Sequence, residues 1–198
     1  MFNRVFFDEN IKYEFYRKFF HISTLVFLLL YKVNFWIGFF ASLFFMVVYL
    51  ILELLRIMEK NLFFFKNLSD ILVKTRKVPS CKIYLSPIFL IVSIFCTYFF
   101  IEKPFSYIGI LSACLGDGFA SLFGKLIPSF TLVNNKTFAG SFSVFLVAFI
   151  VCYYFFPNCF LASIVGMGAM LVELFDFAKY DNLFLPLGVA TLSFLLVT

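Results

Sequence analysis

The chain alternates between long apolar runs and short polar segments. The apolar runs are continuous and do not alternate residue by residue, which excludes the strands of a membrane β-barrel. Hydrocarbon requires each segment to pair its own backbone, so the runs are predicted to be helices of about 20 residues or slightly fewer. Seven spans are predicted, at 19–33, 35–55, 83–101, 104–124, 138–156, 158–175 and 182–197. We therefore expect an all-α fold that forms a single domain over residues 1–198.

The amino-acid composition indicates that these helices belong to a membrane protein. Hydrophobic residues make up 63% of the chain, whereas a soluble domain is nearer half apolar. We expect a polytopic protein embedded in a membrane, with no nucleic acid among its partners. A single histidine excludes a multi-histidine metal site, and five cysteines without a C-x-x-C pair indicate neither a zinc site nor a disulfide framework.

The distribution of positive charge predicts the orientation of the spans. With the N-terminus in the cytoplasm, fourteen of the sixteen lysines and arginines fall in the inner segments, and only Lys32 and Lys103 fall outside. Inner loops of membrane proteins carry this excess of positive charge. The bias supports an odd number of spans and a C-terminus on the outer side.

In this topology the unusual polar residues gather at the cytoplasmic face. They are Glu14, Arg17, Lys18, His21, Glu53, Arg56, Asp117, Lys125, Asn134, Asn135, Lys136, Thr137, Glu173, Asp176, Asp181 and Asn182. Carboxylates of this kind hold Mg²⁺ and the cations hold phosphate oxygens, so the set suits a metal-bound polyphosphate. The neighbouring apolar spans would hold a lipid tail.

Simpler interpretations exist for several of these residues. Arg17, Lys18 and His21 are also typical of an anchor at the lipid headgroups, and Asp181 with Asn182 would cap the last helix. Glu173 is harder to explain structurally, because the sequence around it offers no nearby cation.

The segment 114–125, CLGDGFASLFGK, places charge inside an apolar run, which usually marks a working site. On a helix it forms two adjoining stripes. The small-residue stripe, which permits close helix packing, comprises Gly116, Ala120 and Gly124, with Gly109 and Ala113 upstream. The polar stripe comprises Asp117, Ser121 and Lys125. The spacing does not match a Walker A loop, because five residues separate Gly118 from Gly124.

Several motifs follow one another along the chain. They are E-x-x-R-K-x-x-H at 14–21, G-D-x-x-A-x-x-x-G-K at 116–125, K-T-x-x-G-S at 136–141, Glu173, and D-N-L-x-x-P at 181–186. Together they resemble the polyprenol kinase family of integral membrane proteins, which includes dolichol kinase, phytol kinase and CTP-dependent diacylglycerol kinase. Two positions depart from the family pattern. Ala139 stands where an acidic residue is common, and the run 126–129 lacks a common glycine.

The resemblance implies transfer of a phosphoryl group from CTP to the hydroxyl of a membrane lipid alcohol at the cytoplasmic face. The acceptor would be a polyprenol, a phytol-like alcohol or diacylglycerol, the cofactor Mg²⁺, and the location a cell membrane of the bacterial inner-membrane type. Catalytic roles would fall to Asp117, Lys136 and His21. Nucleotide binding would involve Gly116, Lys125, Lys136, Thr137, Gly140, Arg17 and Lys18, and metal binding Asp117, Glu173 and Asp181.

Two other functions remain open at this stage. A phosphatidate cytidylyltransferase would need similar phosphate and metal groups but would release pyrophosphate. A small transporter would need polar groups near the bilayer midplane, whereas the predicted polar groups cluster at one face.

Overall fold

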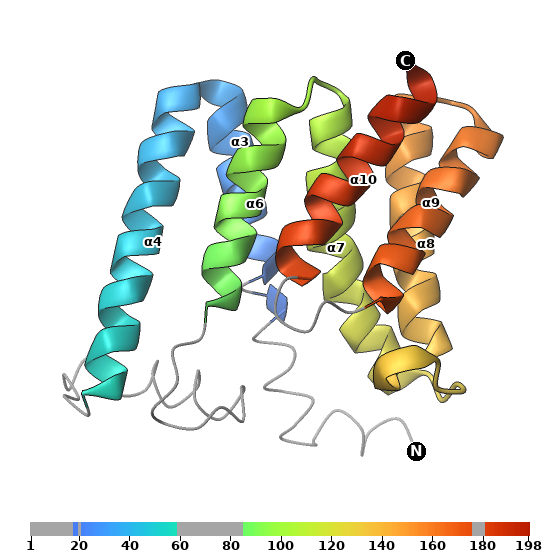
Figure 1. The fold of residues 1–198 in the computed structure, drawn as a ribbon, viewed down its shortest axis with the longest axis horizontal. Coiled ribbons are helices and arrows are strands. Elements are labelled where there is room, and N and C mark those ends of the chain that lie inside the picture. Colours follow the sequence, from blue (N-terminus) through green and yellow to red (C-terminus); the bar gives the residue numbers. More distant parts are fainter. Residues whose placement is uncertain (1–17, 20, 59–84, 176–180) are drawn as a thin grey trace.

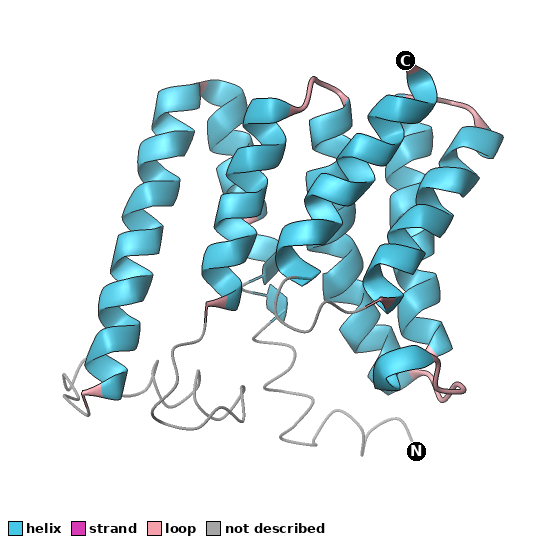
Figure 2. Cartoon of the chain, viewed as in Figure 1, coloured by secondary structure: helices cyan, strands magenta, loops and turns pink. Residues whose placement is uncertain are grey.

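A computed structural model describes residues 18–19, 21–58, 85–175 and 181–198 of the chain, and these parts are helical without a β-strand (Figure 2). Each of the seven predicted spans overlaps one α-helix of the described residues. The helices are α3 (Leu25–Val33), α4 (Phe35–Ile57), α6 (Ser86–Phe100), α7 (Phe105–Leu126), α8 (Phe138–Phe155), α9 (Cys159–Leu174) and α10 (Asp181–Val197), with a 3-10 turn at Val133–Asn135. The prediction of an all-α fold is confirmed for the described residues.

The first predicted span is not one continuous helix. Helical turns at 18–19 and 21–23 precede α3, and the chain turns at Thr24, whose hydroxyl donates to the carbonyl of His21 at 2.6 Å. A threonine side chain that bonds the backbone locally competes with the regular helical pattern. Thr24 itself keeps helical backbone angles (φ −64°, ψ −15°), so the turn is a local irregularity between the polar part of this segment, with Lys18 and His21, and the apolar helix α3.

Three of the helical segments are long and apolar enough to cross a membrane, namely Phe35–Leu55, Phe105–Leu126 and Phe138–Phe155. The other helices are apolar but shorter. Large apolar side chains are widely exposed, and α4 is the clearest case, with Trp36, Phe40 and Phe44 each at least 60% exposed. Exposed apolar surface on this scale is unusual for a protein in water.

The helices stand side by side and run up and down (Figure 1). The short connections α3–α4, α6–α7 and α8–α9 and the C-terminus lie at one end, and the loop between α7 and α8 lies at the other. Two buried apolar clusters hold the bundle together, one among α7, α8, α9 and α10 and one among α3, α6 and α7. Helix α7 contributes to both, so it is the central element.

The predicted small-residue stripe of α7 packs against α8, as close packing requires. A Cβ atom added to Gly124 would lie 2.7 Å from Oγ1 of Thr137, and one added to Gly140 of α8 would lie 2.8 Å from the Ala120 carbonyl oxygen. The upstream part of the stripe has a different neighbour, because Gly109 abuts Pro186 of α10. Glycines at these positions therefore set the spacing of α7 from two helices.

Candidate functional site

Asp117 lies near the middle of α7 and is held by two residues from the N-terminal segment. The Lys18 ammonium donates to its Oδ2 atom at 2.6 Å, and Nε2 of His21 lies 3.4 Å from the same oxygen. The side chain of Lys18 is only 7% exposed. A charged group so far removed from water needs a close partner of opposite sign, and Asp117 supplies it.

One of the two glycines that flank Asp117, Gly118, gives the N-terminal segment room beside α7. A Cβ atom on Gly118 would lie 2.9 Å from Cδ1 of Ile22, which neighbours His21, so the missing side chain lets the N-terminal segment approach α7. Gly116 faces Val144 of α8 instead. The role of Gly118 was missed in the sequence, although a second glycine directly beside an aspartate was a usable signal.

Glu173, at the end of α9, has both carboxylate oxygens engaged. Lys136 donates from Nζ to Oε1 at 2.8 Å and also to the backbone carbonyl of Glu173, while the buried Ser141 hydroxyl donates to Oε2 at 3.1 Å. The run 163–174 that contains Glu173 offers no cation, and the fold supplies one from 37 residues upstream. Charge-assisted hydrogen bonds of this kind fix the carboxylate in position.

Lys136 is the residue just before the N-cap of α8. Thr137 caps the helix by accepting a hydrogen bond from the Gly140 N–H at 3.3 Å, and its hydroxyl also lies 3.5 Å from the Gly124 carbonyl. Thr137 and Gly140, which the resemblance assigns to the nucleotide, therefore shape the junction of α7 and α8. They hold the backbone that carries Lys136.

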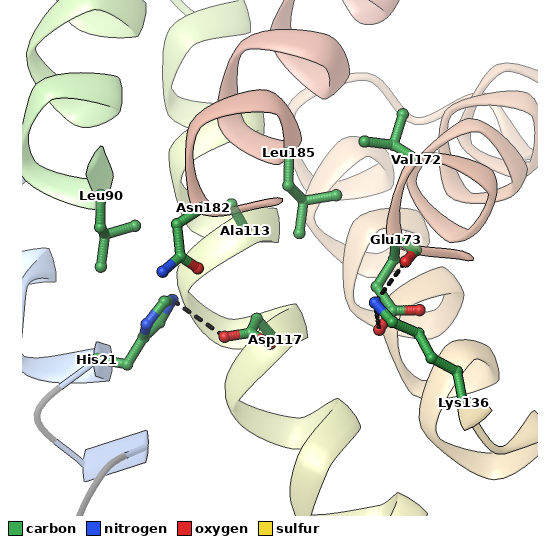
Figure 3. A pocket seen from close by; sticks show the side chains of 9 residues that line it. All are labelled: His21, Leu90, Ala113, Asp117, Lys136, Val172, Glu173, Asn182 and Leu185. Atoms are coloured by element: carbon green, nitrogen blue, oxygen red, sulfur yellow. Dashed lines mark hydrogen bonds and ion pairs between the residues drawn. The ribbon is translucent and has the colours of Figure 1, made fainter. Parts of the chain in front are cut away.

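A pocket lies between Asp117 with His21 and the Lys136–Glu173 pair (Figure 3). Its polar lining consists of His21, Asp117, Lys136, Glu173 and Asn182, and its apolar lining of Leu90, Ala113, Val172 and Leu185. Figure 3 shows Asp117 beside His21 on one side and Glu173 beside Lys136 on the other. One pocket thus offers cations, carboxylates and hydrocarbon surface together.

Asn182 ties the first turn of α10 to α6. Its side-chain amide donates to both the carbonyl and the hydroxyl oxygen of Ser86, and Ser93 donates to the Leu183 carbonyl at 2.8 Å. These contacts fix the start of α10 beside the pocket. The motif residue Asn182 therefore has a structural partner as well as a place in the lining.

The structure brings together five of the predicted site residues, namely Lys18, His21, Asp117, Lys136 and Glu173. Two members of the polar stripe on α7 lie elsewhere. Lys125 is exposed on the last turn and is not among the described residues that line the pocket, and the Ser121 hydroxyl donates to the Gly118 carbonyl of its own helix. Arg17 and the side chain of Asp181 lie outside the described residues.

Within the described residues, no group of three or more His, Cys, Asp or Glu side chains is placed to hold a metal ion. Mg²⁺, however, commonly binds through one or two carboxylates together with substrate phosphates and water. Asp117 and Glu173 face the same pocket, so the residues present are compatible with a magnesium ion that arrives with a polyphosphate.

Comparison of the chain with models of protein families, with curated proteins and with solved structures finds no match. The resemblance to polyprenol kinases therefore rests on the sequence motifs alone.

Proposed function

We propose that this chain is an integral membrane protein whose seven helices are embedded in the bilayer, with the α7–α8 loop at the cytoplasmic face. Support comes from three apolar helices of spanning length, from the exposed apolar side chains of α4, and from the bias of positive charge. Shorter helices such as α9 are accommodated by local thinning of the bilayer and by snorkelling flanks.

We further propose that the protein is a CTP-dependent lipid kinase. The observation that carries this proposal is a pocket lined by the Lys136–Glu173 pair, Asp117 and His21 beside apolar side chains, with Lys18 bonded to Asp117. Lys136 would bind a phosphate of the nucleotide, and the apolar lining would contact the lipid alcohol. Phosphoryl transfer requires mainly positioning and neutralisation of charge, and these groups supply both.

In the proposed reaction the lipid hydroxyl oxygen attacks the γ-phosphorus of CTP. A new P–O bond forms, the bond between the γ-phosphorus and the β–γ bridging oxygen breaks, CDP leaves, and the hydroxyl proton passes to a base. His21 is a candidate base, because its Nε2 atom lies 3.4 Å from Asp117 and a neighbouring carboxylate orients an imidazole and stabilises its charged form. Asp117 itself is the other candidate.

Lys18 and Lys136 would bind phosphate oxygens, either by giving up their contacts with Asp117 and Glu173 or by contacting phosphate and carboxylate together. Asp117 and Glu173, joined by Asp181, would then hold Mg²⁺, which when bound supplies neutralisation of the phosphate charge. Ser141 would keep Glu173 in place when Lys136 turns to the nucleotide, since it holds the other carboxylate oxygen. Arg17, Lys125 and the Thr137–Gly140 turn complete the proposed nucleotide contacts.

The test is incubation of the purified protein with labelled nucleotide and a panel of lipid alcohols comprising a polyprenol, phytol and diacylglycerol, with phosphatidate added for comparison. Label from the γ-phosphate of CTP should appear in the lipid, with less or none from ATP or UTP. Transfer of the cytidylate moiety to phosphatidate would contradict the kinase and support a cytidylyltransferase. Absence of any transfer to lipid would remove both.

A further inference from the structure

The loop between α7 and α8 exposes three large apolar side chains, Ile127, Phe130 and Val133, which we call the apolar tip. Phe130 is 65% exposed and Val133 is 64% exposed. The loop lies at the same end of the bundle as the start of α10 (Figure 1). Exposed apolar clusters of this kind commonly mark a surface that contacts a protein or a membrane.

Hydrogen bonds fix the loop, so the exposure of the apolar tip belongs to its folded backbone. The backbone N–H of Phe138 donates to the Phe130 carbonyl at 3.0 Å, and the backbone N–H of Lys136 donates to the Val133 carbonyl at 3.2 Å. Asn134 makes the turn at a positive φ of 57°, a conformation that asparagine tolerates better than most residues. The loop therefore holds Phe130 and Val133 outward and carries Lys136 at its base.

The apolar tip continues an aromatic surface on α8. The Phe130 ring stacks on Phe138 at 5.0 Å between centroids, and the row continues along the helix through Phe142, Phe145, Phe149 and Tyr153 at 5.6 to 6.1 Å. Phe138 and Phe142 are themselves exposed. In the proposed bundle the exposed members of this row, Phe138, Phe142 and Tyr153, face lipid, which places the apolar tip at the inner edge of the same lipid-facing surface.

We propose that the apolar tip inserts into the bilayer that holds the bundle, at the boundary between headgroups and acyl chains, so that its partner is the lipid surface. This inference rests on the membrane placement in the proposed function. Interfacial segments bury apolar side chains about 5–10 Å into this boundary and keep cations toward the headgroups. Lys125, which is exposed just before the tip, supplies such a cation.

Insertion of the apolar tip has a consequence for the site. Lys136 is three residues beyond Val133. Its backbone N–H donates to the Val133 carbonyl, and its side-chain ammonium donates to the Glu173 carboxylate. A tip held at the boundary therefore holds Lys136 at the depth of the headgroups, where the hydroxyl of a lipid alcohol lies. The loop would thus set the depth of Lys136 in the membrane relative to the hydroxyl of the lipid substrate.

Tryptophan fluorescence tests this placement, because the chain has one tryptophan, Trp36. Phe130→Trp and Val133→Trp, each combined with Trp36→Phe, place a single reporter on the apolar tip. The second variant is independent of the ring stack on Phe138. The proteins are placed in nanodiscs of phosphatidylcholine and phosphatidylglycerol with a nitroxide quencher either near the headgroup or at the chain end, and acrylamide serves as the soluble quencher.

We expect the shallow nitroxide to remove most of the reporter emission, and the chain-end nitroxide and acrylamide to remove little. Strong quenching by acrylamide alone, in discs where wild-type Trp36 is quenched by lipid, would overturn the inference and leave the membrane bundle intact. Emission that neither kind of quencher reaches would show that protein covers the tip, and would also overturn it. Failure of both lipid quenchers on wild-type Trp36 would instead overturn the membrane placement itself.

Discussion

Removing the charge of Lys136 should destabilise the protein more than removing both members of its pair with Glu173. The two side chains are 20% and 11% exposed and meet at 2.8 Å. Loss of one member of a buried ion pair costs about 3–5 kcal/mol, because the remaining charge has no full partner. Ser141 still donates to Glu173 after Lys136→Met, so the lower value, about 3 kcal/mol, is expected.

Adding Glu173→Gln to Lys136→Met should restore part of the lost stability. Glu173→Gln keeps the shape of the side chain and an acceptor for Ser141 but removes the buried negative charge. In the double variant neither charge remains, so the two effects should fall short of their sum by about 1–3 kcal/mol, as is typical of directly interacting residues. Lys32→Met, at an exposed position of α3, is the matched control and should stay within about 0.5 kcal/mol of wild type.

Thermal unfolding in one detergent measures all five proteins. A loss of about 3 kcal/mol corresponds to a fall in Tm of roughly 6–12 °C for a chain of this size. The double variant should unfold at a higher temperature than the Lys136→Met variant. Strictly additive losses in the double variant would refute the reasoning, because they would mean that Lys136 and Glu173 do not interact in the folded protein.

Three further outcomes are expected. Asp117→Ala and Lys136→Ala should each lower lipid phosphorylation about 100-fold or more, because each removes a group that neutralises or orders charge in the transition state. Wild-type turnover in membranes that contain normal amounts of either variant would contradict the assignment of the site. A cysteine at Lys125, an exposed position just before the apolar tip, in an otherwise cysteine-free protein should react with an impermeant maleimide only from the cytoplasmic side, and labelling from outside intact cells would reverse the topology. Ser141→Ala should cost about 1.5–3 kcal/mol of stability by removing a hydrogen bond to the Glu173 carboxylate, and an unchanged Tm would show that this bond contributes little.

The helices were largely predictable because apolar runs bounded by polar residues leave few alternatives. The seven predicted ranges each overlap a described helix, and α8 begins and ends within a residue of its prediction. The turn at Thr24 was not predicted, because it depends on one local hydrogen bond to His21 rather than on hydropathy. Pattern reasoning detects the run of apolar residues but not the point at which one side chain interrupts it.

The site was predictable in its members but not in its pairing. Counting positive charge placed Lys18, Asp117, Lys136 and Glu173 at one end of the bundle. In the structure Asp117, Lys136 and Glu173 line one pocket, and Lys18 pairs with Asp117. Which lysine meets which carboxylate depends on how distant helices pack, across 99 residues in one pair and 37 in the other. Lys125 lies outside the pocket lining for a related reason, because helical spacing puts Asp117, Ser121 and Lys125 on one stripe of α7 but does not determine how much of that stripe a neighbouring helix covers.

Gly118 gives the sharpest test of how the N-terminal segment reaches Asp117. Gly118→Val would place a branched side chain against Ile22, where even a Cβ atom would lie 2.9 Å from Cδ1. The helical backbone itself gains from replacing glycine, so a loss of stability would have to come from this contact. We expect the substitution to move Lys18 and His21 away from Asp117, and so to lower both Tm and phosphoryl transfer.

A second substitution separates this contact from other effects of a larger residue at position 118. Ile22→Ala shortens the opposing side chain, so the double variant Gly118→Val with Ile22→Ala should recover part of the Tm and part of the transfer rate. Gly116→Ala is the matched control for stability, because its Cβ atom would lie an ordinary 3.5 Å from Val144. Normal stability and transfer in Gly118→Val, or an equal fall in Tm in Gly116→Ala, would contradict the view that the glycine after Asp117 admits the segment that carries its partners.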